Sequence, residues 1–397
     1  MGRRRFLQTA IVSATALSTT DFVRAGTSPI AASEDTKGQQ TAMPQRELGK
    51  TGIKIPILQL GTAQRMNPVY DKVMHLCLRE GVTWFDTALA YGRGASHQAI
   101  ANFLEQTSAR KDLWLTSKSG SRTPQGLIRD IDKALAQLKT DYLDLYLMHG
   151  IKSTDMLDKA YLKAGEQLRK SGKTRLFGFS CHDGNVVQLM DAAAQVGGLD
   201  AILFRYNFRR YGDRELNLAI DNCKQAGIGL LAMKTMGSVS PDIEEVVQFR
   251  SRDFTLAQAK LKSVWADERI DSVVSEMDSV RVARENIAAA KSERSLTAED
   301  SHQLNRLAAL TANYACNGCS HLCESAITGN IAIAEQLRYL MYYECYGKQE
   351  RARELYRSIP LQVRGFDEDQ LKKASAVCPQ GIDIAARLNQ ARKVLAI

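Results

Sequence analysis

Residues 113–148 read LWLTSKSGSRTPQGLIRDIDKALAQLKTDYLDLYLM and contain the unit that decides the fold. Two short apolar runs, Leu113–Ser117 and Tyr142–Met148, predict strands. The stretch between them, Gly126–Leu138, has the apolar spacing of an amphipathic helix. A strand, a helix and a second strand in this order predict a parallel pair, because parallel strands need a crossover connection.

The same alternation extends in both directions, from Arg46 to about Ala290. Six further strands are expected, at Ile57–Gly61, Thr83–Thr87, Arg175–Ser180, Ala201–Tyr206, Gly229–Met233 and Ser272–Ser275. Eight strand–helix units in about 245 residues match the usual size of a (β/α)₈ barrel, roughly 250 residues. A doubly wound sheet would use the same alternation, but no Gly-x-Gly-x-x-Gly follows the first strand. We therefore expect an α/β fold, a TIM barrel over residues 44–294.

The composition is that of a globular chain and does not indicate nucleic-acid binding. The chain has 397 residues, 44% of them hydrophobic, which is enough to bury a large core and more than one domain. Its formal net charge is +9, but the basic residues form no long run and no basic helix with interleaved aromatic residues. Because following a phosphate backbone requires a concentrated basic patch, no nucleic-acid partner is expected.

The N-terminus is expected to be a targeting segment. It begins Met1-Gly2-Arg3-Arg4-Arg5-Phe6-Leu7, continues with a short apolar stretch and reaches a small-x-Ala sequence at Val23-Arg24-Ala25. This pattern is typical of a signal peptide, and its apolar part is too short to span a bilayer. The start resembles a twin-arginine export signal, so residues 1–25 are expected to direct export to the periplasm through that machinery and to leave no membrane span in the mature chain. The alternative is a basic disordered tail, and residues 26–43 are expected to form a polar linker.

Four reactive side chains stand at or just after the ends of three successive expected strands. They are Asp86, Tyr91, Lys118 and His149. Each has a structural alternative, as a helix cap, a packed ring, a solvated lysine or a hydrogen-bonded histidine near the core. A barrel, however, would bring all four to its carboxyl-terminal face, where active sites are built.

Together these side chains suit the reduction of a carbonyl group. Hydride arriving at the carbon leaves charge on the oxygen, which a phenol such as Tyr91 can protonate. A buried ammonium beside the phenol, from Lys118, is expected to lower its pKa, and Asp86 would keep that ammonium charged. His149 would donate a hydrogen bond to the developing oxyanion. The hydride must come from a cofactor.

These residues carry a family resemblance over about residues 46–290. The segment Arg46–Gly52 and the run Leu60-Gly61-Thr62 are similar to the opening of aldo-keto reductases. Phe85-Asp86-Thr87-Ala88, with Tyr91, Lys118 and His149, resembles the catalytic tetrad of that family. The resemblance implies an oxidoreductase whose nicotinamide cofactor, NADP or NAD, lies over the barrel mouth.

The resemblance also implies which residues hold the cofactor. Ser180 would bind the carboxamide, Lys234 would approach the cofactor, and Arg284, Glu285 and Asn286 would lie at the adenine end. The chain departs from the family where Cys181 follows the serine and Leu203 stands on the sixth strand. The acidic segment around Glu276 and Asp278 would repel a 2′-phosphate unless Arg281 or Arg284 compensates, so NADP and NAD both stay open.

The tail, residues 295–397, is expected to be a small, mainly helical, cysteine-bearing domain, with helices at Ile331–Tyr346 and Glu350–Ile359. Its cysteines are Cys316, Cys319, Cys323 and, far downstream, Cys378 before a proline. Three clustered cysteines and a remote Cys-Pro resemble the ferredoxin-like region of some aldo-keto reductases, which implies a [4Fe–4S] cluster held by four thiolates. Disulfides or a zinc site with four cysteines would use the same residues.

The leading hypothesis is an exported oxidoreductase that reduces an aldehyde, ketone or sugar-like carbonyl, or oxidises the alcohol. A nicotinamide bound before export and an electron-transfer partner that uses the cluster would supply the electrons. The alternative is a redox or ligand-sensing module with a slow or vestigial barrel site. Activity that depends on the Tyr91 hydroxyl distinguishes the two.

Overall fold

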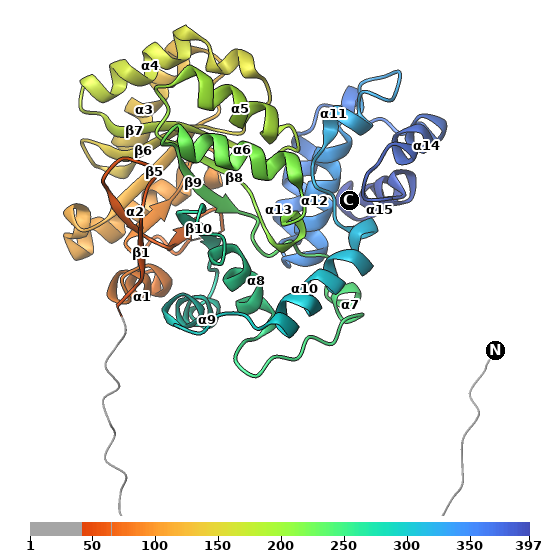
Figure 1. Ribbon diagram of the computed structural model, residues 1–397. Coiled ribbons are helices and arrows are strands. Elements are labelled where there is room, and N and C mark those ends of the chain that lie inside the picture. The colour runs from red at the N-terminus through yellow and green to blue at the C-terminus, as the bar shows by residue number, and fades with distance from the viewer. Residues whose placement is uncertain (1–41, 65) are drawn as a thin grey trace, which may run out of the picture. The chain divides into compact units, whose positions relative to one another are not determined.

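The computed structural model describes residues 42–64 and 66–397, so the expected signal peptide lies outside the described residues. Eight parallel strands form a closed barrel in the order β10-β3-β4-β5-β6-β7-β8-β9 (Figure 1). They span Leu58–Gly61 (β3), Trp84–Asp86 (β4), Trp114–Ser119 (β5), Leu143–Met148 (β6), Thr174–Cys181 (β7), Ala201–Arg205 (β8), Gly229–Met233 (β9) and Ser272–Glu276 (β10). The expected (β/α)₈ barrel is therefore confirmed, and all eight expected strands are present.

Helices cover the outside of the barrel between successive strands. They span Lys72–Arg79 (α1), Ala95–Thr107 (α2), Pro124–Leu138 (α3), Lys159–Lys170 (α4), Val186–Val196 (α5), Arg214–Gln225 (α6), Pro241–Glu244 (α7), Leu256–Trp265 (α8) and Val280–Lys291 (α9).

Helix α3 shows how the sequence specifies these helices. The Thr123 side chain caps the first turn by accepting a hydrogen bond from the backbone N–H of Gly126, and Pro124 occupies the first helical position. Leu127, Ile131 and the following apolar residues at helical spacing are buried against the strands.

A short antiparallel hairpin closes the amino-terminal end of the barrel. Its strands, Gln45–Glu47 (β1) and Lys54–Pro56 (β2), have only three residues each and were not expected from the sequence. Leu48 and Ile55 of this hairpin are fully buried in the core inside the barrel, together with Trp84 and Leu147. The opposite, carboxyl-terminal end is therefore the end left open for a site.

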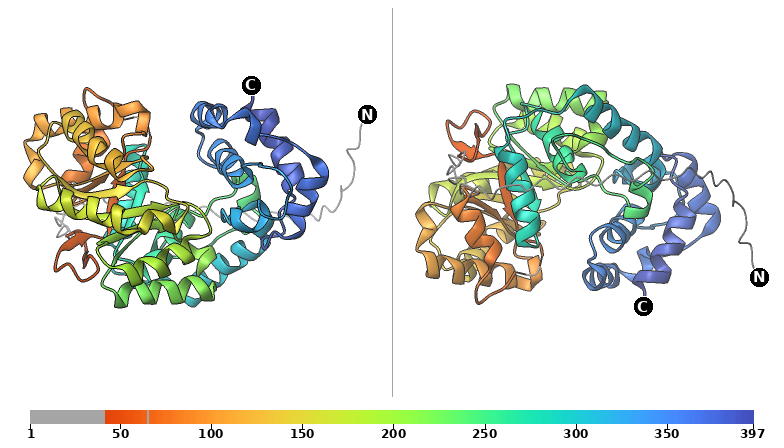
Figure 2. Two further views of the ribbon diagram at one scale, coloured as in Figure 1. Left: turned by 90° about the horizontal axis from the view of Figure 1, so that it is seen from above. Right: turned by 90° about the horizontal axis from the view of Figure 1, so that it is seen from below.

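The C-terminal residues form helices beside the barrel (Figures 1 and 2). They span Ala298–Leu310 (α10), Ser320–Cys323 (α11), Ile333–Cys345 (α12), Gln349–Ser358 (α13), Glu368–Ala376 (α14) and Ile384–Leu395 (α15). Leu304 and Leu307 of α10 pack against Phe208 of the barrel, whereas Ile333 and Leu337 of α12 belong to a separate core with the cysteines. No helix within the described residues is long and apolar enough to cross a membrane.

Candidate active site

The four expected tetrad residues meet at the carboxyl-terminal end of the barrel. Asp86 is the last residue of β4, Lys118 lies near the end of β5, and His149 directly follows β6. Tyr91 begins a short 3₁₀ turn after β4, and this loop is tied to β5 by the hydrogen bond from Leu89 N to Lys118 O, 3.2 Å. Parallel strands in register therefore deliver all four side chains to one face.

The Lys118 ammonium is the centre of this group. Its Nζ donates to Asp86 Oδ1 at 2.6 Å, to the Thr87 carbonyl at 2.8 Å and to Tyr91 Oη at 3.4 Å. The Lys118 side chain is 1% exposed and the Asp86 side chain 4% exposed. All three ammonium protons thus have acceptors, which a buried charge requires.

The Tyr91 phenol stays protonated in this setting. Burial raises its pKa well above the usual value, and the negative charge of Asp86 raises it further. The pKa of Tyr91 is therefore raised overall, not lowered as expected, because burial of the phenol is the largest effect. Asp86, whose charge raises this pKa, lies 2.6 Å from the Lys118 ammonium, whereas Tyr91 lies 3.4 Å from it.

His149 is held as a neutral imidazole. Burial lowers its pKa to about 3, and the cations Lys118 and Arg122 contribute to this shift. Its ring stands nearly perpendicular to the Tyr91 ring, with the centroids 5.8 Å apart. A neutral imidazole keeps one N–H that can be donated to an oxygen placed beside the phenol.

Two cavities meet at the tetrad. The first, called the mouth cavity here, has a volume of about 1200 Å³ and is lined by Tyr91, His149 and His182 and by residues of α12 and α13. The second, the side cavity, has about 1130 Å³ and runs from Asp86 and Tyr91 to the end of β10 and the start of α9. Tyr91 faces both cavities, so a group in the side cavity and a molecule in the mouth cavity would meet at its hydroxyl.

The residues expected around a cofactor are dispersed. Lys234 lines both cavities. Ser180 is 1% exposed and its Oγ accepts a hydrogen bond from Gly150 N at 2.9 Å. Asn286 supports the side cavity from behind, because its Nδ2 donates to Ser275 Oγ at 2.9 Å.

The other two expected cofactor residues lie on the outer side of α9. Arg284 is exposed. Glu285 accepts a hydrogen bond from Thr255 Oγ1 at 2.6 Å and so faces α8. Among the described residues that line the side cavity, neither Arg284 nor Glu285 is present. Their cofactor roles stay predictions.

Several residues of the site were not found from the sequence. His182 follows β7 and faces both cavities, and its strand-end position was the one signal available. Arg338 and Tyr342 come from α12, and Lys348 pairs with Glu276 at the end of β10. These contacts join segments far apart in the chain, and no local sequence pattern marks them.

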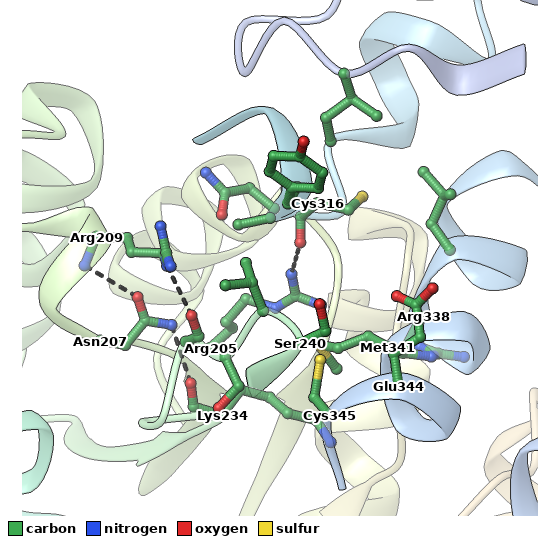
Figure 3. A pocket seen from close by; sticks show the side chains of 18 of the residues that line it. Arg205, Asn207, Arg209, Lys234, Ser240, Cys316, Arg338, Met341, Glu344 and Cys345 are labelled. Atoms are coloured by element: carbon green, nitrogen blue, oxygen red, sulfur yellow. Dashed lines mark hydrogen bonds between the residues drawn. The ribbon is translucent and has the colours of Figure 1, made fainter. Parts of the chain in front are cut away.

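A third cavity connects the barrel with the cysteine-bearing region. This junction cavity, of about 770 Å³, is lined by Lys234 from the barrel and by Arg338 and Cys345 from α12 (Figure 3). Arg205, at the end of β8, crosses it and donates from Nη1 to the backbone carbonyl of Cys316 at 2.6 Å.

The four expected metal ligands face one small cavity. Cys316, Cys319, Cys323 and Cys378 all line this cysteine cavity, whose volume is about 320 Å³. All eight cysteines of the chain are free thiols. In residues 42–64 and 66–397, no group of three or more His, Cys, Asp or Glu side chains is drawn together so as to hold a metal ion. The thiols therefore surround a space without closing on a single point.

Comparison with known proteins relates the barrel to a family of enzymes. The profile of the Aldo/keto reductase family matches residues 58–250. An uncharacterized oxidoreductase of Bacillus subtilis is 26% identical over 301 residues, 65% of this chain and 94% of the relative. The methylglyoxal reductase of Salmonella typhimurium is 28% identical over 268 residues, again 65% of this chain and 94% of the relative.

Solved structures show the same fold. A thermostable aldo-keto reductase in complex with the inhibitor epalrestat aligns with a TM-score of 0.53 at 26% identity, over 67% of this chain and all of that chain. The holo form of an aldo-keto reductase of Bacillus halodurans aligns with a TM-score of 0.57 at 21% identity, over 67% of this chain and 96% of that chain.

Proposed function

We propose that the chain is an NAD(P)-dependent oxidoreductase of the aldo/keto reductase family, whose profile matches residues 58–250, and that Tyr91 protonates a carbonyl substrate in the mouth cavity. The substrate is an aldehyde, a ketone or a sugar-like carbonyl, and the reverse reaction oxidises the alcohol. The single observation that carries this proposal is the Lys118 ammonium, which contacts both Asp86, at 2.6 Å, and Tyr91, at 3.4 Å.

Each member of the tetrad has a distinct part in the proposed reaction. The Tyr91 hydroxyl holds the proton that the substrate oxygen needs once hydride has reached the carbon. Lys118 stabilises the phenolate left behind, and Asp86 keeps the ammonium charged and aimed. His149, neutral at ordinary pH, donates its N–H to the oxygen while negative charge develops there.

The side cavity fits a nicotinamide cofactor, which supplies the hydride when bound. It begins at Tyr91 and reaches Ser275 and Val282, so it offers an extended path from the reacting atoms to the start of α9. Glu276 is already paired with Lys348, which removes its part of the repulsion expected toward a 2′-phosphate, whereas Asp278 also lines the side cavity. We assign NADP because a fission-yeast relative, 27% identical over 139 residues and 40% of its own length, is named an NADP(+) enzyme.

We also propose that the cysteine cavity holds an iron–sulfur cluster. Four thiols on its wall match the ligand count of a [4Fe–4S] cluster, which would supply one-electron chemistry. A zinc ion bound by four cysteines would use the same side chains. Iron and acid-labile sulfide in anaerobically purified protein, both absent from a Cys378→Ser variant, would support the cluster. One zinc ion per chain, without iron or sulfide, would refute it.

Export and electron supply are further parts of the proposal. The Arg3-Arg4 pair is expected to direct the folded, cofactor-loaded protein through the twin-arginine route to the periplasm. An electron-transfer partner would then reload the cofactor through the cysteine region. Cell fractionation of the wild type and of an Arg3→Lys/Arg4→Lys variant tests the route, and a wild-type protein retained inside the cell refutes it.

The catalytic part is tested by following NADPH oxidation with a set of aldehydes. Tyr91→Phe removes the proton and leaves the ring, and it should lower kcat by roughly 10²- to 10⁴-fold. Tyr161→Phe, which alters a phenol bonded to the Arg122 carbonyl outside the tetrad, is the matched control and should stay near wild type. Unchanged turnover in Tyr91→Phe would refute the assignment.

A further inference from the structure

The mouth cavity carries more positive charge than its own acids can balance. Among the described residues, six cationic side chains line it and three acidic ones do, a surplus of three positive charges. The acids are already paired within the cavity. The three pairs are Lys152 with Asp183, Arg338 with Glu335, and Lys348 with Glu276.

The cations left without an acid of the cavity are Arg122, Lys234 and Arg351, but the cation best placed to hydrogen-bond a substrate is Arg338 of α12. Its side chain is only 15% exposed, and both of its hydrogen bonds, to Glu335 Oε1 at 2.8 Å and to Tyr339 Oη at 3.3 Å, leave from Nη2. Within residues 42–64 and 66–397 the donors on Nε and Nη1 have no hydrogen-bond partner. They are therefore available to a molecule in the cavity.

The charge of Arg338 reaches the reacting end of the cavity. Burial is the largest cause of the lowered pKa of His182, and the positive charge of Arg338 is the second largest. The same charge also contributes to the lowered pKa of His149. His182 adds a second unused group, because its Nδ1 is buried and, in the described part of the chain, has no partner. The two imidazole rings lie 6.3 Å apart, so these unused polar groups stand beside the tetrad.

Arg338 and Lys234 differ in the cavities that their side chains line. Lys234 lines both the mouth cavity and the side cavity, so its ammonium is available to the cofactor. Arg338 lines the mouth cavity and the junction cavity, and it is not among the described residues of the side cavity (Figure 3). A negative charge that needs Arg338 therefore belongs to the substrate.

We propose that the substrate is a carbonyl compound bearing a carboxylate, an oxo acid or acidic sugar, whose carboxylate is bound by Arg338 with His182 while its carbonyl meets Tyr91. A guanidinium with two free donor groups matches the two oxygens of a carboxylate. This inference rests on the proposed function. It gives the C-terminal region a direct part in choosing the substrate.

The test compares acids with neutral analogues of the same reactivity. NADPH-dependent reduction of 4-carboxybenzaldehyde is measured against its methyl ester, and reduction of succinic semialdehyde against butanal. The wild type should prefer each acid by at least roughly 10-fold in kcat/KM. Arg338→Met should lower kcat/KM for the acids by roughly 10- to 100-fold, the usual range for a lost charged hydrogen bond, and change that for the neutral compounds less than 3-fold.

Two further variants sharpen the result. Arg338→Lys keeps the positive charge but loses the paired N–H donors of the guanidinium, so its kcat/KM for the acids should fall between those of wild type and Arg338→Met. Arg353→Met removes an arginine of α13 that is 19% exposed, pairs with Glu350 and is absent from the described lining of the mouth cavity, so it should change kcat/KM for acids and neutral compounds less than 3-fold. NADPH affinity should be unchanged in Arg338→Met.

The outcomes separate this inference from the proposed function. Reduction of all four compounds without preference for the acids overturns the carboxylate site and leaves the reductase standing. The comparison of wild-type rates decides this even if Arg338→Met does not fold. Weaker NADPH binding in Arg338→Met assigns the charge to the cofactor and also overturns it. No NADPH-dependent reduction of any compound overturns the proposed function itself.

Discussion

The buried pair of Asp86 and Lys118 allows a prediction whose size can be worked out. Its atoms lie 2.6 Å apart and both side chains are less than 5% exposed. Asp86→Asn leaves a buried ammonium without its counter-ion, which typically costs about 3–5 kcal/mol. The buried ammonium can avoid part of this cost by releasing its proton. Deprotonating Lys118, whose pKa is near 10.4 in the unfolded chain, costs about 4.6 kcal/mol at pH 7 and about 1.9 kcal/mol at pH 9, and this cost sets the upper limit of the loss.

Asp86→Asn should therefore lower the free energy of unfolding by about 3–4.6 kcal/mol at pH 7 and by less than about 2 kcal/mol at pH 9. The sign follows from linkage: the unfolded chain binds a proton on Lys118 that the folded variant releases, so the variant gains stability relative to wild type as pH rises. Urea unfolding followed by circular dichroism at both pH values measures this.

The double variant Asp86→Asn/Lys118→Met completes the test. It should be more stable than either single variant, because it leaves no unpaired charge, yet it should stay inactive since Tyr91 has lost its cation. Asp132→Asn, which breaks an exposed pair with Lys173 at the same 2.6 Å, is the matched control and should cost less than about 1 kcal/mol. A loss below about 1 kcal/mol in Asp86→Asn, or additive losses in the double variant, would refute the reasoning.

Three further predictions concern pH, packing and the cofactor cavity. Because the pKa of His149 is about 3 when folded and about 6.5 when unfolded, acidification from pH 7 to pH 5 should cost up to about 2 kcal/mol, and His149→Gln should flatten this dependence in urea titrations. A Cβ at Gly178 would lie 1.9 Å from a backbone oxygen of the next strand, so Gly178→Ala should lower stability by at least about 1–3 kcal/mol. Gly172→Ala, with open space around it, should cost only about 1 kcal/mol of backbone strain, and equal melting temperatures for the two variants would contradict this. Lys348→Met frees the charge of Glu276 and should weaken NADPH binding roughly 2- to 5-fold in fluorescence titrations, with recovery in Lys348→Met/Glu276→Gln; a double variant as weak as the single one would show that the charge of Glu276 is irrelevant.

The barrel and the tetrad could be predicted because their signals are local. Each barrel strand is a short, unbroken apolar run, and the reactive residues stand at strand ends, where the topology brings them together. The hairpin β1–β2 was missed because strands of three residues carry no alternating pattern. The direction of the Tyr91 pKa shift was wrong because burial of the phenol outweighs the other effects, and the sequence does not show how deeply a residue after a strand is buried.

The residues of the C-terminal region that enter the site were beyond prediction for a different reason. Arg338 and Tyr342 lie on a helix whose sequence shows that it is amphipathic but not which partner its faces meet. Tyr342 stacks over the Lys234 ammonium, with 4.2 Å between Nζ and the ring centroid. Lys234 itself holds a left-handed backbone, with φ of 58°, supported by a hydrogen bond from Asn207 to its carbonyl. Such contacts exist only once the two regions are packed together.

Helix α12 links the two functional parts of the molecule through its two faces. On one face, Ile333 and Leu337 pack into the core that contains Cys316 and Cys378 and line the cysteine cavity. On the other, Arg338 and Tyr342 line the mouth cavity beside the tetrad. A change that expands or collapses the cysteine core must therefore move the helix that presents the guanidinium to the substrate, because packed interiors transmit strain. It follows that replacing the four cysteines should alter the preference among substrates before it alters the chemistry at Tyr91.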